Sequence, residues 1–162
     1  MRGMKPLIRL GLTLANRVPP ALAVAYRVLR VLLDRSPDRF LALMTVGKPK
    51  VDLDLIAEPS IHSRLQGMLQ EATRNGVLGA VQEAGIIARP WGFSLAAIRC
   101  PVELWHGEDD DTAPLSHALR LRDAIPGCRL HVLPGESHMV MWTHLADMLA
   151  FLKDGDAPAA AS

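Results

Sequence analysis

Two short apolar runs in the second half of the chain constrain its fold more than any other feature. Residues 101–105 and 129–133 are predicted strands, and a glycine follows each of them within two residues. Residues 115–125 and 142–152 repeat their apolar positions with a helical period. The order strand, helix, strand, helix is typical of a parallel sheet covered by helices, so the predicted fold class is α/β.

Two strands are few for such a sheet. Parallel pairs occur almost only inside larger sheets with both faces covered, and an isolated two-stranded ribbon is marginally stable in water. The sequence therefore predicts the end of a sheet whose earlier strands are missing from this chain.

The first half of the chain is predicted to be helical. Apolar residues recur at steps of three and four, and Pro19-Pro20 separates the first run from the second. Ser36 is expected to cap a third helix that starts at Pro37. Residues 47–58 are expected to form a linking loop with a short helical turn. The predicted helices cover residues 7–14, 22–33, 37–44, 59–72 and 77–88.

Charge is unevenly distributed over a composition that is otherwise ordinary for a globular protein. Residues 1–50 hold ten basic and two acidic residues, or +8, whereas residues 51–162 sum to −7. The net charge of +1 gives no argument for nucleic-acid binding. We interpret the basic residues 1–50 as solvated arginines on amphipathic helices. Contact with an anionic membrane surface is the less favoured interpretation.

The sequence gives no sign of export. Arginines interrupt the apolar stretches, so neither a membrane span nor a signal peptide is predicted. Two cysteines, Cys100 and Cys128, without CxxC spacing favour a reducing, cytoplasmic compartment and no metal site. Each precedes a predicted strand, so we expect two free thiols that lie near each other.

Polar loops follow both predicted strands. Residues 106–114 hold three adjacent aspartates, and residues 134–138 end in a histidine. Taken alone, the first loop is an acidic turn in which Asp111 or Thr112 caps the next helix, and a single histidine is usually structural. Because consecutive parallel strands are commonly neighbours, an acid from one loop can reach the imidazole of the other. An aspartate that orients a histidine is half of a nucleophile–base–acid triad.

In this order and spacing, the two loops resemble those of the α/β-hydrolase family. The family's acid strand ends in G-x-x-D-x-x-x-P, here Gly107 to Pro114, and its histidine strand ends in G-x-x-H, here Gly135 to His138. The resemblance implies that residues 91–153 are the C-terminal part of an α/β-hydrolase core. It implies a helical cap or lid over residues 1–90, and residues 154–162 are expected to be a disordered tail.

The resemblance also implies roles for single residues. Asp110 matches the triad acid and His138 the triad base. The implied activity is serine-type hydrolysis of an ester, amide or related acyl bond in a small, apolar acyl substrate. No metal or organic cofactor is implied.

The nucleophile of the family is missing. The sequence has no G-x-S-x-G, and its nearest string, residues 92–96 around Ser94, lacks the preceding strand that this serine requires. Other serines have no such context either: Ser60, Ser63, Ser116 and Ser137. We therefore expect a truncated hydrolase whose serine and oxyanion loop lie upstream of Met1.

Two alternatives stay open. The chain can be a non-catalytic binding or oligomerisation module derived from the hydrolase fold. The open sheet edge that suggests truncation would then form an interface. The chain can also belong to the non-hydrolytic relatives, such as dehalogenases, lyases or cofactor-free oxygenases. If earlier strands of the sheet are missing, we expect apolar side chains in residues 7–33 and 61–88 to be partly exposed, so that the chain self-associates or folds poorly.

Overall fold

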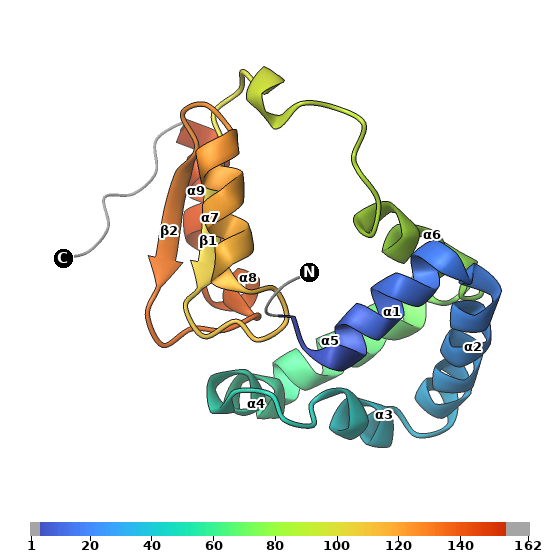
Figure 1. Ribbon diagram of the computed structural model, residues 1–162. Helices are drawn as coiled ribbons and strands as arrows, with labels where there is room; N and C mark the ends of the chain where they lie inside the picture. The colour runs from blue at the N-terminus through green and yellow to red at the C-terminus, as the bar shows by residue number, and fades with distance from the viewer. Residues whose placement is uncertain (1–3, 155–162) are drawn as a thin grey trace. The chain divides into compact units, whose positions relative to one another are not determined.

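The chain forms two compact units, Met1–Gly92 and Phe93–Ser162. The computed structural model describes residues 4–154 (Figure 1). The first unit is helical, and the second combines helices with a parallel strand pair, which is compatible with the α/β class. The assignment of these parts to a cap and a hydrolase core stays a prediction.

Prolines mark where most helices of the first unit begin. Four of its helices carry proline in the first two positions, where the missing N–H costs no hydrogen bond. Ser36 precedes the third of these helices, but its side chain makes no capping hydrogen bond, so that detail of the prediction is wrong. The helices are α1 (Pro6–Arg17), α2 (Pro19–Arg35), α3 (Pro37–Met44), α4 (Lys50–Ala57), α5 (Pro59–Ala72) and α6 (Leu78–Ile87).

Two small apolar clusters hold the first unit together. One joins α1, α2 and α6 through Ala15, Leu22, Ala23 and Val81. The other joins α2 and α3 through Leu33, Phe40 and Leu41. Many other apolar side chains of this unit are exposed, as expected from the sequence.

Helix α4 corrects the expectation of a loop at residues 47–58. Its sequence alternates polar and apolar residues, yet it forms two helical turns that pack against α5. Lys50 and Asp54 form an ion pair at i,i+4 spacing, and Asp52 is buried. Tertiary packing thus overrides the local pattern.

The second unit contains the two expected strands as a parallel pair. Strands β1 (Glu103–Gly107) and β2 (Arg129–Leu133) are in register from Glu103 opposite Arg129 to Gly107 opposite Leu133. The predicted strand at residues 101–105 is shifted by two residues, because β1 begins at Glu103 and includes His106 and Gly107. Helix α7 (Leu115–Ala124) connects the strands and packs on both.

The last predicted helix is divided in two. Helix α8 (Val140–Thr143) ends before His144, and α9 (Leu145–Asp154) follows this residue. The His144 ring lies 3.5 Å from a carboxylate oxygen of Glu136 and 3.3 Å from one of Asp147, so polar contacts hold the break. Phe151 of α9 packs on Trp105 of β1, and Figure 1 shows α7 in front of the strands and α9 behind them.

Asp154, placed in the tail by the sequence prediction, is the last residue of α9. Residues 155–162, the rest of the predicted tail, lie outside the described residues. No helix within residues 4–154 is long and apolar enough to cross a membrane.

Both cysteines are free thiols, and their expected closeness stays a prediction. The pKa of the Cys128 thiol is raised, mainly by burial. The charge of Glu103 raises this pKa further, and the charge of Arg122 lowers it in part. A raised pKa makes the thiol a poor nucleophile at neutral pH.

Candidate active site

The loops that follow the two strands are joined by backbone hydrogen bonds. We call residues 108–114 the acid loop and residues 134–138 the histidine loop. Glu108 N donates to Leu133 O at 3.1 Å, and Asp109 N donates to Glu136 O at 3.0 Å. The Ser137 hydroxyl donates to Asp109 O at 3.3 Å. The carboxyl ends of both strands therefore open into one connected site, the place where open parallel sheets bind ligands.

Gly107 allows the two loops to come this close. A Cβ atom at this position would lie 2.3 Å from Ser137 O and 2.5 Å from Glu136 O, distances that real Cβ atoms do not show. The obstructing atoms are backbone, so a side chain could not be accommodated by a rotamer change. The histidine loop crosses directly over Gly107 because this residue is glycine.

Asp110 and His138 are hydrogen-bonded across the two loops. His138 Nδ1 lies 2.9 Å from Asp110 Oδ2. The carboxylate side chain is 6% exposed, whereas the imidazole is 45% exposed. The buried acid therefore holds a histidine whose ring remains open to solvent or substrate.

Backbone amides bind the other oxygen of the same carboxylate. Thr112 N and Ala113 N donate to Asp110 Oδ1 at 2.7 and 2.9 Å. Helix α7 has no side-chain cap at its start, so the expected capping by Asp111 or Thr112 is wrong. Asp110 therefore has both expected roles. One of its oxygens accepts from backbone amides of the acidic turn, and the other is bonded to His138.

The pKa of Asp110 lies below its ordinary value of 3.8. Burial is the largest influence and on its own raises this pKa. The hydrogen bond from His138, the amides of Ala113 and Thr112 and the charge of His138 together outweigh it. Asp110 is therefore ionised at neutral pH.

The Asp110–His138 pair can accept a proton from a nucleophile. When Nδ1–H of neutral His138 donates to Asp110, the proton-free Nε2 can take a proton from a nucleophile. The ionised carboxylate then stabilises the imidazolium that results. This arrangement fits a general base and the acid that orients it.

His106 is part of this site, although the sequence analysis did not select it. Its side chain is 13% exposed, and Nε2 lies 2.9 Å from Ala113 O and 4.0 Å from Asp110 Oδ2. A histidine four residues before the acid was the available signal, but its bond to a loop carbonyl depends on the path of the backbone.

A second polar cluster lies at the opposite end of the strands. The Glu103 side chain is 1% exposed and contacts Arg129 Nε and His131 Nε2. The His131 ring stacks on Trp105 with centroids 4.8 Å apart. The Arg129 cation and the hydrogen-bonded His131 ring satisfy the buried carboxylate, so we assign this cluster a structural role.

Two serines of the second unit, Ser94 and Ser137, lack the setting of a catalytic nucleophile in the described part of the chain. Ser94 lies in extended backbone before a short 3₁₀ turn, Leu95–Ala97, and follows no strand in the described part of the chain. Ser137 is 1% exposed and donates to Asp109 O. Within residues 4–154, no group of three or more His, Cys, Asp or Glu is arranged to hold a metal ion.

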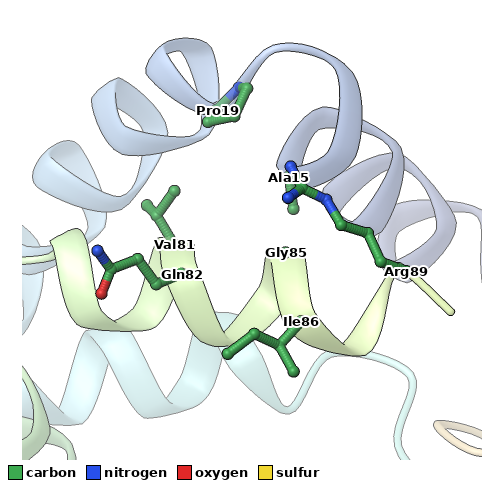
Figure 2. A pocket seen from close by; sticks show the side chains of 7 residues that line it. All are labelled: Ala15, Pro19, Val81, Gln82, Gly85, Ile86 and Arg89. Carbon is green, nitrogen blue, oxygen red and sulfur yellow. The ribbon is translucent and has the colours of Figure 1, made fainter. Parts of the chain in front are cut away.

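The helical unit has a hollow of about 370 Å³ between α1, α2 and α6 (Figure 2). Gln82 and Arg89 contribute its polar groups, and Arg89 Nε donates to Asn16 Oδ1 at 3.2 Å. No serine, cysteine or histidine is among the described residues that line the hollow. The lining residues are Ala15, Pro19, Val81, Gln82, Gly85, Ile86 and Arg89.

Comparison with curated proteins relates the chain to the hydrolases. Over 124 residues it is 29% identical to the pimeloyl-[acyl-carrier protein] methyl ester esterase of Chromobacterium violaceum. The match covers 75% of this chain and 44% of that esterase, so the chain spans less than half the length of this relative. No family model matches the chain, and no solved structure matches it. The likeness supports a hydrolase-like relationship.

Proposed function

We propose that this chain carries the acid and the base of a serine-type α/β hydrolase that cleaves an ester, amide or related acyl bond. The observation that carries the proposal is the hydrogen bond between Asp110 and His138, formed where two parallel strands end. The likeness to an esterase supports the same class of reaction.

Each residue has a role in the proposed reaction. His138 Nε2 takes the proton of a serine hydroxyl while the serine oxygen bonds to the substrate carbonyl carbon. The imidazolium then gives this proton to the leaving group, and the carbonyl–leaving-group bond breaks. Water repeats the two steps on the acyl-enzyme and releases the carboxylic acid. Asp110 keeps the proton of neutral His138 on Nδ1 and stabilises the imidazolium.

The serine and the oxyanion donors are proposed to come from residues outside this sequence. No G-x-S-x-G is present in the 162 residues, and the curated esterase is more than twice as long as the segment it shares with this chain. The two-stranded sheet supports the same proposal, because parallel strands are normally part of a larger sheet.

The proposed substrate is a small molecule with an apolar acyl group. The helical unit is proposed to act as the lid, and its hollow is lined mainly by apolar side chains. The printed name of the curated relative is that of a methyl ester esterase, which favours an ester over an amide. Free cysteines fit a cytoplasmic location.

A binding or oligomerisation module is the second candidate, and one surface favours it. Val24, Val28 and Val31 lie on one face of α2 and are 57%, 66% and 46% exposed. We call them the valine stripe. An exposed apolar stripe of this kind marks a contact surface, which a module without a nucleophile would use as its function.

The nucleotide sequence upstream of Met1 and the protein it encodes test the proposal. We expect an open frame with a G-x-S-x-G after a β-branched run. The protein that includes it should hydrolyse p-nitrophenyl butyrate and react with a fluorophosphonate at that serine. The 162-residue chain alone should do neither. The absence of such a frame, or turnover by the chain alone that His138→Ala abolishes, would contradict the proposal.

A further inference from the structure

His106 connects the end of strand β1 to the far side of the acid loop. It precedes Gly107, and its side chain is largely buried. Its Nε2 lies 2.9 Å from Ala113 O. A carbonyl oxygen only accepts, so Nε2 carries the proton and donates it. The imidazole thus closes the loop that begins after Gly107.

Ala113, the residue that His106 bonds, is itself bonded to the carboxylate of Asp110. Ala113 offers its carbonyl to His106, and its N–H donates to Asp110 Oδ1 at 2.9 Å. Thr112 N donates to the same oxygen at 2.7 Å. Two donors on one oxygen fix the plane of the carboxylate, and Oδ2 remains for His138. His106 Nε2 is 4.0 Å from Oδ2, beyond hydrogen-bond distance, so it does not take the place of His138.

We propose that His106 is a positioning residue, which holds the acid loop so that Asp110 Oδ2 faces His138. It acts through Ala113 and touches neither the substrate nor the reacting atoms. The inference rests on the proposed function, because it assigns His106 a role for the same acid and base. The proposed role of His106 depends on the N–H donor at Nε2 and not on the volume that the ring fills.

The tautomer of His138 reports whether Asp110 is correctly placed. A neutral imidazole carries one proton, either on Nδ1 or on Nε2. Donation to Asp110 holds this proton on Nδ1, whereas a free imidazole favours Nε2. Long-range proton–nitrogen NMR spectra of the ¹⁵N-labelled chain distinguish the two forms. We expect the Nδ1–H form in the wild-type chain and its loss in Asp110→Ala.

Two amide substitutions separate the donor from the ring. In His106→Gln the side-chain nitrogen reaches the position of Nε2 and can donate to Ala113 O, whereas in His106→Asn it is too short. We expect His138 to keep the Nδ1–H form in His106→Gln and to shift towards Nε2–H in His106→Asn and His106→Leu. His62→Gln, a change in the helical unit, is the control and should leave the spectrum of His138 unchanged.

The two amide variants decide the outcome, even if His106→Leu does not fold. The same result in both, whether an unchanged tautomer or a lost fold, overturns the role of His106. An Nε2–H form of His138 in the wild-type chain would instead contradict the Asp110–His138 pair and with it the proposed function. Failure of the inference and failure of the function are therefore distinguishable.

Discussion

At the scale of single residues, Asp110 is bonded on both oxygens by groups of different kinds. Backbone amides of its own loop hold Oδ1, and the imidazole of His138 holds Oδ2. These contacts outweigh the cost of burial and keep the carboxylate ionised. The charge of Asp110 therefore stabilises the fold and also orients the ring of His138.

The lowered pKa of Asp110 predicts a pH-dependent stability. A carboxyl group with a lower pKa in the folded state contributes stability that is fully present above its unfolded pKa. The contribution is lost as the pH falls through the folded pKa, here below 3.8. Asp110→Asn should lower the free energy of unfolding at neutral pH, and its difference from the wild type should shrink in acid. Urea titrations between about pH 7 and pH 3 measure this difference.

Asp109→Asn is the matched control for this titration. Asp109 joins the loops through its backbone N–H and carbonyl, so the wild-type acid dependence should persist in this variant. An Asp110→Asn difference that is constant over the whole range would show that the Asp110 charge is not coupled to folding.

At the scale of elements, one glycine determines how the loops after β1 and β2 pack. Gly107→Ala would force its methyl group against two backbone oxygens. We expect it to lower the free energy of unfolding by at least about 2 kcal/mol, since overpacking against backbone cannot relax by rotamer changes. Urea unfolding followed by tryptophan fluorescence reports this, because Trp105 and Trp142 belong to the same unit.

Gly67→Ala is the opposite case. Gly67 lies inside α5, and a Cβ atom there would meet nothing within 4 Å. Alanine should therefore raise stability by about 0.5–1 kcal/mol, as measured by circular dichroism. Equal effects of the two substitutions would contradict the close crossing of the histidine loop over Gly107.

The strands and most helices could be predicted because their signals are local. Apolar runs bounded by proline and glycine mark both strands, and prolines mark the helix starts. Helix α4 could not be predicted, because Lys50 to Leu55 alternate polar and apolar residues as a strand would. Its helical form depends on packing against α5. The division of the last helix at His144 likewise depends on contacts with Glu136 and Asp147.

For the candidate site, the sequence predicts that the two loops lie next to each other. Consecutive parallel strands bring residues 106–114 and 134–138 together, and this much follows from the order of elements. The position of His106 could not be predicted, because its partner is a backbone carbonyl that no residue type specifies. The Glu103 cluster also depends on strand register, which pairs Glu103 with Arg129.

At the scale of the whole molecule, many large apolar side chains are exposed around two small buried clusters. The valine stripe on α2 lies opposite the buried Leu22 and Leu33 of the same helix. We expect the chain to self-associate through this stripe. Sedimentation of the wild-type chain should show dimers or larger species at micromolar concentrations, and Val28→Glu should shift them towards monomer.

Gln70→Glu adds the same charge at an exposed position of α5 and is the control for this experiment. It should leave the distribution of species unchanged. A wild-type chain that sediments as a monomer would contradict the role of the valine stripe and remove the main support for an oligomerisation module.

The proposed hydrolase depends on His138 as its base, so the most direct test is the value of kcat/KM after this residue is changed. The measurement uses the protein that joins this chain to its upstream serine, with p-nitrophenyl butyrate as the substrate. His138→Ala should lower kcat/KM by about 10³-fold or more, because removing one triad member disables the whole unit. His62→Ala removes a half-buried histidine that pairs with Asp38 and should leave kcat/KM unchanged. Full activity in His138→Ala, or an equal loss in both variants, would contradict the account.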